Sequence, residues 1–242
     1  MRSREAPPSA RAPGLTAAEC LRAKIALALG GLTAASGAVW EHPRLADLFP
    51  DFLCALHTGM RATEHSLRTA AECARARAAS DPVAAGIADY LARHADEERQ
   101  HDDWLLEDLE VLGVDPNEVL TRIPLPSVAA LVGAQYYWMH HYHPVAFMGY
   151  IAVLEGRPPV KGFLEQVIKQ TGLPRGAFRT YFVHAALDHH HVREFEDTLN
   201  RLPLRPEHIG VIGVSAITTV DLLRQVHEDV LEVFEEKQSA RA

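Results

Sequence analysis

The stretch that decides the fold is YFVHAALDHHHVREFEDTL, residues 181–199, which contains neither glycine nor proline. Because an α-helix turns by about 100° per residue, His184, Asp188 and His191 fall on one stripe of a helix built from this stretch. Phe195, one turn later, continues the stripe with an apolar side chain. Such a stripe could be a solvated surface or a metal site, and its apolar continuation favours a face that points inward.

Almost all of the chain after residue 15 shows the same helical pattern, and no segment alternates as a β-strand does. Glycine and proline separate the segments, and Ser80-Asp81-Pro82 has a capping residue before a proline, which is typical of a helix start. The expected helices are residues 16–36, 44–79, 82–112, 126–155, 160–171, 174–200 and 206–238. Pro144 is expected to kink or split the fourth of them. The short linkers predict a single all-α domain.

Composition and charge indicate a globular protein. The 242 residues, 48% hydrophobic and 23% charged, suffice for one sizeable core, and the net charge of −8 argues against nucleic acid as a partner. Residues 1–14, rich in proline, alanine and arginine, are expected to form a disordered tail before a helical domain spanning 15–242. No clean apolar span emerges, so we expect no membrane association. Three scattered cysteines fit a reducing cytosol, which predicts a cytoplasmic protein.

Two further segments carry residues that bind metals. In HADEERQHDDW, residues 94–104, Glu98 and His101 form the Glu-x-x-His step by which helix bundles bind a pair of iron or manganese ions. Glu155 follows an apolar run, and a buried carboxylate needs a partner or a cation. Each segment alone could be an ordinary polar helix face, but three together are harder to explain in that way. Mixed carboxylate and imidazole ligands suit iron or manganese.

Three more histidines, His140, His141 and His143, lie beside aromatic residues in the fourth expected helix. We favour packing, or support of metal ligands, over direct ligation for them. Arg61, Arg157 and Lys161 could pair with a substrate carboxylate, although surface basic residues are more often simply solvated.

The segments EERQH (97–101), HPVAFMGYIAVLEG (143–156) and HAALDHHH (184–191) together resemble the heme-oxygenase-like diiron oxidases and oxygenases, in that order along the chain. The resemblance extends from about residue 50 to 235. It implies a single-domain, seven-helix heme-oxygenase-like bundle that binds two iron ions instead of heme. It also implies dioxygen as co-substrate in the oxidation of a small molecule.

The resemblance further implies a ligand set. His101 matches the histidine of the family's second ligand helix, and Glu155 matches its lone glutamate. His184, Asp188 and His191 match the family's His-x-x-x-Asp-x-x-His motif. These five residues are therefore expected to bind iron.

Two carboxylate positions follow less directly from the resemblance. An earlier helix would add Glu64, with Glu72 as its rival, and Glu98 would be the carboxylate three residues before the ligand histidine. Seven residues before that histidine, where a glutamate would be expected, the chain has His94. One iron is expected to be held by Glu98, His101 and His184, and the other by Glu64, Glu155, Asp188 and His191.

These expectations predict an O₂-dependent, non-heme diiron oxidoreductase acting on an amino-acid-like or fatty-acid-like molecule, by N-oxygenation, desaturation or oxidative C–C cleavage. The alternatives are a non-catalytic iron- or heme-binding protein, a cofactor-free thiaminase-like or PQQ-synthase-like enzyme on the same fold, and a structural helical partner protein. Residues 211–234, a helical face rich in leucine and valine, could bury the seam of a homodimer.

Overall fold

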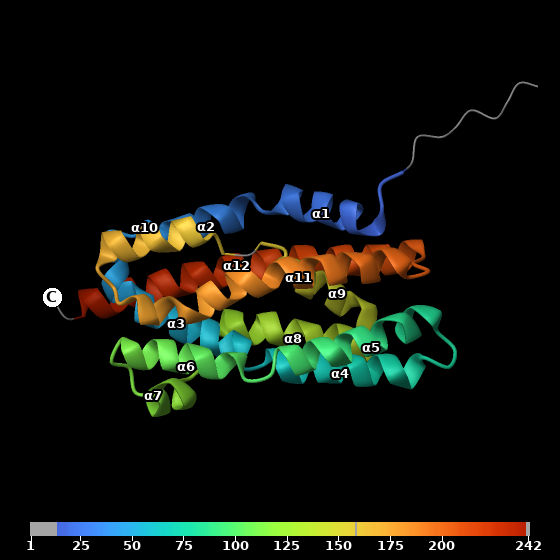
Figure 1. Cartoon of the computed structure of the whole chain (residues 1–242), viewed down its shortest axis with the longest axis horizontal. Helices are drawn as coiled ribbons and strands as arrows, with labels where there is room; N and C mark the ends of the chain where they lie inside the picture. The colour runs from blue at the N-terminus through green and yellow to red at the C-terminus, as the bar shows by residue number, and fades with distance from the viewer. Residues whose placement is uncertain (1–13, 158, 241–242) are drawn as a thin grey trace, which may run out of the picture.

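The computed structural model describes residues 14–157 and 159–240, and for Asp188 and His189 the backbone alone. Within these ranges the chain forms α-helices and two short 3₁₀ turns, with no strand (Figure 1). The all-α prediction is therefore confirmed. Of the tail expected at residues 1–14, all but the last residue lies outside the described part of the chain.

The helices are bounded as follows: α1 Ala17–Ala28, α2 Gly30–Trp40, α3 Leu45–Met60, α4 Thr63–Arg77, α5 Pro82–Glu97, α6 His101–Val111, α7 Pro116–Thr121, α8 Pro126–His141, η1 Pro144–Ala146, α9 Phe147–Leu154, α10 Lys161–Thr171, η2 Arg175–Phe178, α11 Arg179–Arg201 and α12 Pro206–Ser239. The expected count of seven helices was wrong, because several expected helices are divided. Pro144 separates α8 from α9, as anticipated. The glycine-rich start of α2 follows a bend of 62° from α1.

The longest helix, α12, lies in the middle of the elongated bundle and packs against α1, α2, α8 and α9 (Figure 1). Its buried residues recur along one side, from Val211 to Phe234. By length and apolar composition α12 could also cross a membrane, but the central helix of a globular bundle has the same properties.

The contact between α9 and α12 depends on a residue without a side chain. Gly149 is buried, and a Cβ atom at this position would overlap the carbonyl oxygen of Ile212 and the amide nitrogen of Ala216. Glycine thus lets the backbones of the two helices approach closely. This contact fixes α9, the helix that carries Glu155 at its C-terminal end.

Candidate metal centre

Two groups of metal-ligand side chains lie next to each other inside the bundle. One consists of His94, Glu98, Glu155 and His191, and the other of Glu98, His101 and His184. Within each group, one ligand atom from each residue lies within 4.8 Å of the others. Because Glu98 belongs to both groups, the arrangement has room for two neighbouring cations that share one carboxylate.

A break between α5 and α6 brings the first ligands together. The sequence predicted one helix over 82–112, but α5 ends at Glu97, and Gln100 takes the left-handed conformation with φ of 65°. The Glu-x-x-His step therefore spans a break instead of one helical turn. Glu98 Oε2 and His101 Nδ1 are 3.1 Å apart across it, and both side chains are buried. A non-glycine residue in this conformation costs energy, which surrounding contacts must offset.

Glu155, from α9, reaches the end of α5. Its Oε1 lies 2.6 Å from His94 Nε2, whereas its Oε2 is buried and has no hydrogen-bond partner. The Nδ1 of His191, on α11, is likewise buried without a partner, and it lies 3.8 Å from that same Oε2. Buried polar atoms are seldom left unpaired, and a cation coordinated by both atoms would satisfy them.

His184 presents one ring nitrogen in the form that binds metals. Its Nδ1 donates a hydrogen bond to the carbonyl oxygen of Thr180 over 3.0 Å, which leaves the lone pair on Nε2 free. Histidines that bind metals commonly make such a bond through the other ring nitrogen. The ring also stands perpendicular to that of His101, with the centroids 5.2 Å apart. Burial lowers the pKa of His184 and so favours the neutral form that ligation requires.

The carboxylates make the site strongly negative. Burial disfavours protonation of His94, but the hydrogen bond to Glu155 and the charges of Glu155, Glu98 and Glu97 outweigh it and raise the pKa of His94 to about 9. Burial also acts to raise the pKa of Glu98, yet the hydrogen bond and charge of His101 hold that pKa below its usual value. Glu98 is only 8% exposed. A buried negative site of this kind attracts cations, and a metal ion bound there would displace the proton of His94.

A third group, Asp81, His143 and His208, is also compact enough for a metal ion, but its hydrogen bonds indicate another role. The Nδ1 atoms of His143 and His208 each accept a bond from a backbone N–H, at Val145 and Arg205. Both rings then carry their proton on Nε2, where a metal would need a lone pair. His143 Nε2 instead lies 2.7 Å from Asp81 Oδ2. The group therefore joins helix ends, and its hydrogen bonds reach none of the ligands of the two groups described above.

A cavity of about 340 Å³, called the inner cavity below, opens beside the metal ligands. Glu98, Glu155 and His184 line part of it, and most of the remaining wall is apolar or aromatic. Ligand sites in proteins typically have this size and lining. The arrangement thus places a small-molecule cavity in contact with the candidate metal centre.

Comparison with known families agrees with this donor set. A family model described as "Iron-containing redox enzyme" matches residues 49–222. The chain belongs to this family. A comparison with curated proteins gave no significant match.

Solved structures resemble this member of the iron-containing redox enzyme family in fold. A domain of unknown function with a heme oxygenase-like fold from Shewanella denitrificans OS217 is 19% identical, with a TM-score of 0.77, covering 90% of this chain and 94% of that one. Heme oxygenase-2 from Synechocystis sp. PCC 6803, solved with heme and NO, is 19% identical, with a TM-score of 0.68 and coverage of 92% and 88%. A TenA homolog from Pseudomonas syringae pv. tomato DC3000 is 14% identical, with a TM-score of 0.65 and coverage of 92% and 98%. These similarities establish that the chain has the heme oxygenase-like fold.

Most of the predicted ligands of this iron-containing redox enzyme family member come together. Glu98, His101, Glu155, His184 and His191 all belong to the two groups. The backbone of Asp188 lies in α11 between the two ligand histidines, but its side chain is outside the described residues.

Glu64 stands apart from both groups. Its carboxylate on α4 bonds to the guanidinium of Arg68, with distances of 2.8 and 2.9 Å, and Arg68 also pairs with Asp96. Its rival Glu72 is exposed on the same helix. The ligand group that contains Glu155 and His191 includes His94 instead.

His94 is the residue that spacing alone did not assign as a ligand. It lies four residues before Glu98, the residue that caps α5, so the two side chains fall on the same helical face. This spacing is the sequence feature that could have identified His94 as a ligand. Glu97 also comes near, with its Oε2 at 3.4 Å from His94 Nδ1 and 3.7 Å from His191 Nε2. Being 39% exposed, Glu97 borders the buried cluster from the solvent side.

Proposed function

We propose that this protein is a non-heme diiron oxidoreductase that uses dioxygen to oxidise a small molecule held in the inner cavity. The observation that carries the proposal is that Glu98 belongs to two adjacent groups of imidazole and carboxylate ligands. Membership of the iron-containing redox enzyme family supports iron as the metal. Carboxylates that can bind two ions at once, with histidines on either side, are typical of diiron centres in helix bundles.

The residues present fit such a pair of ions. Glu98, His101 and His184 would hold one iron, and His94, Glu98, Glu155 and His191 would hold the other. The two carboxylates offset part of the charge of two divalent cations, and the unpaired Glu155 Oε2 and His191 Nδ1 would gain a partner. When bound, the iron supplies the redox chemistry with dioxygen, which amino-acid side chains cannot supply themselves.

The protein's own contribution is position and exclusion of water. The carbonyl of Thr180 fixes the orientation of the His184 ring through the bond to Nδ1. Phe147 and Met148 of α9 are fully buried, and Tyr150 of the same helix lines the inner cavity. The largely apolar lining of the inner cavity would shield a reactive centre from water and leave room for an organic substrate.

The test is anaerobic addition of ferrous iron to the metal-free protein, followed by removal of unbound metal and elemental analysis. We expect two iron ions per chain, oxygen uptake after exposure to air, and no intense Soret band in the visible spectrum. A purified protein with a Soret band would favour heme binding instead. A protein that retains no iron would favour a cofactor-free enzyme, and either result would overturn the diiron proposal.

A further inference from the structure

Glu97, the last residue of α5, contacts two of the ligand histidines through the ring nitrogens that do not face Glu155. Its Oε2 lies 3.4 Å from His94 Nδ1 and 3.7 Å from His191 Nε2. The other nitrogen of each ring faces Glu155, with His94 Nε2 at 2.6 Å from Oε1 and His191 Nδ1 at 3.8 Å from Oε2. Each imidazole therefore stands between an inner carboxylate, Glu155, and an outer one, Glu97.

Exposure to solvent falls sharply from Glu97 to the two histidines. The side chain of Glu97 is 39% exposed, whereas those of His94 and His191 are 2% and 6% exposed. Beyond them, the buried Oε2 of Glu155 and Nδ1 of His191 have no hydrogen-bond partner. These contacts therefore lead from solvent to two buried, unpaired ligand atoms, which a cation would satisfy.

The charge of Glu97 is not taken up by a basic side chain. In the described part of the chain, the ion pairs of Glu97 are with imidazoles alone. By contrast, Asp96, the preceding residue, pairs with Arg68 at 3.1 Å. Glu194 of α11 pairs with Arg93 at 2.7 Å. Because a guanidinium would compete with a metal ion for the carboxylate oxygens, Glu97 is the acid of this surface best suited to bind a divalent cation.

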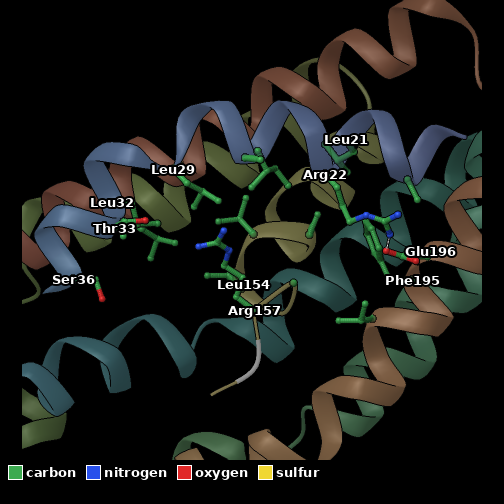
Figure 2. A pocket seen from close by; sticks show the side chains of 18 of the residues that line it. Leu21, Arg22, Leu29, Leu32, Thr33, Ser36, Leu154, Arg157, Phe195 and Glu196 are labelled. Atoms are coloured by element: carbon green, nitrogen blue, oxygen red, sulfur yellow. Dashed lines mark ion pairs between the residues drawn. The ribbon is translucent and has the colours of Figure 1, made fainter. Parts of the chain in front are cut away.

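The cavities beside the metal centre are poor routes for a cation. Most of the inner cavity's wall is apolar or aromatic, and an ion is costly to bring into apolar surroundings. An outer cavity of about 510 Å³ lies between α1, α2 and residues of α9, α11 and α12, and shares four lining residues with the inner one. Its lining combines leucines with Arg22, Arg157 and Glu196, two positive charges against one negative (Figure 2). Neither lining attracts a dication.

We propose that Glu97 is the entry site of the metal: it binds a divalent cation from solvent and passes it to His94, His191 and Glu155. Glu97 and the two histidines are not among the described residues that line the inner or the outer cavity. Loading along this side of the centre leaves the inner cavity open to the organic substrate. The inference rests on the metal centre of the proposed function, and it gives a role to a residue that belongs to neither ligand group.

The experiment is stopped-flow mixing of the metal-free full chain with cobalt(II), whose visible absorption changes when protein ligands replace water. We expect Glu97→Gln to lower the second-order rate constant of uptake at least about tenfold, because charges lining the approach to a site raise association rates by about 10- to 1,000-fold. The final cobalt content should remain two per chain. The difference in rate should shrink at high salt, which screens exposed charges.

Asp96→Asn is the matched control, since it removes the same charge from the neighbouring position of α5, whose side chain is 58% exposed. This variant should take up cobalt(II) at the rate of the unmodified protein. Glu97→Asp keeps the charge and should recover most of the rate that is lost in Glu97→Gln. Circular dichroism and the melting temperature verify that the three variants are folded.

Three results would overturn this inference: uptake in Glu97→Gln as fast as in the unmodified protein, equal slowing in Asp96→Asn, or loss of one cobalt ion at equilibrium. The last result would make Glu97 a permanent ligand. An unmodified protein that binds no cobalt would reject both the entry site and the diiron function. The expected rates, in a chain whose iron-loaded form consumes no oxygen, would reject the diiron oxidation alone.

Discussion

The carboxylate of Asp108, on α6, accepts a hydrogen bond from the backbone N–H of Thr180 in the first turn of α11, over 3.0 Å. Phe178, which precedes α11, offers no side-chain cap, so a residue of another helix caps α11. Asp108 is fully buried, and burial raises its pKa against the opposing effect of its bonds to this turn. Because α6 begins at His101 and α11 contains His184, the bond fixes these two histidines relative to each other.

Replacing Asp108 with alanine is expected to destabilise the fold and weaken metal binding. The change leaves the N–H of Thr180 buried without a partner, at a cost of about 1–3 kcal/mol. Thermal unfolding and iron content measure the two effects. Asp103→Ala, at an exposed position of the same helix, is the control and should behave as the unmodified protein. If both variants unfolded at the same temperature, the capping role of Asp108 would be refuted.

Removal of the shared carboxylate should affect both iron ions. We expect Glu98→Ala to lose both, because Glu98 belongs to the two ligand groups, whereas His184→Ala and His191→Ala should each lose one. Elemental analysis after reconstitution gives iron per chain. Glu64→Gln is the control: since Glu64 pairs with Arg68 outside both groups, this variant should keep two irons.

Variants at Asp188 and Glu64 test two residues that the resemblance implies as ligands but that are not in the ligand groups of the described residues. Asp188→Ala should lower the iron content from two towards one per chain, as its place between the two ligand histidines of α11 predicts. An Asp188→Ala protein with two irons and full oxygen uptake would remove this residue from the ligand set. Loss of one iron in Glu64→Gln would restore Glu64 in place of His94.

The sequence predicted helix starts well, because their chemistry is local. Asp81 caps α5 through bonds to the backbone N–H groups of Val83 and Ala84, with Pro82 in the first turn. The break at Gln100 could not be predicted in this way, since neither glycine nor proline marks it. Gln100 itself is exposed, but Glu98 and His101 on either side of it are buried and meet His184 of α11, and the local sequence carries no information about such long-range contacts.

In the candidate metal centre, too, local spacing could be predicted from the sequence and long-range contacts could not. Helical spacing placed His184 and His191 on one face of α11, and the structure has both in the ligand groups. The contact of His94 with Glu155 joins residues 61 positions apart and depends on how α9 lies against α5. Spacing within one helix cannot show such a pairing. Periodicity therefore identified candidate ligands, and the tertiary fold decides which of them meet.

Gly149→Ala should be destabilising although alanine is the better helix former. The added methyl group would overlap the backbone of α12 at Ile212 and Ala216, and overpacking of a buried contact costs about 1–3 kcal/mol. Displacement of α9 would also move Glu155, so iron affinity should fall with stability.

Gly133→Ala in α8 is the matched control. No atom lies within 4 Å of a Cβ there, so its higher helix propensity should raise stability by up to about 1 kcal/mol. Chemical denaturation distinguishes the two, and equal effects would contradict the close contact.

Asp81 should make stability depend on pH in acid. Burial acts to raise its pKa, but hydrogen bonds from His143 and from the N–H groups of Ala84 and Val83 outweigh it and lower the pKa from 3.8 to about 2. A carboxyl group with a lower pKa in the folded state stabilises the fold above its unfolded pKa. That stabilisation is lost as the pH falls through the folded pKa. The window is therefore about pH 4 to 2.

Asp81→Asn separates the charge from the cap, because asparagine also caps helices. Above pH 4 the variant should be less stable than the unmodified protein by about 1–2 kcal/mol, a figure reduced for the partial exposure of Asp81. This difference should shrink as the pH falls to 2, where the aspartate of the unmodified protein becomes protonated. Urea unfolding at several pH values measures it, with Asp89→Asn on the exposed side of α5 as the control. A difference that stayed constant from pH 5 to 2 would show that the pairing of Asp81 with His143 contributes no charge-dependent stability.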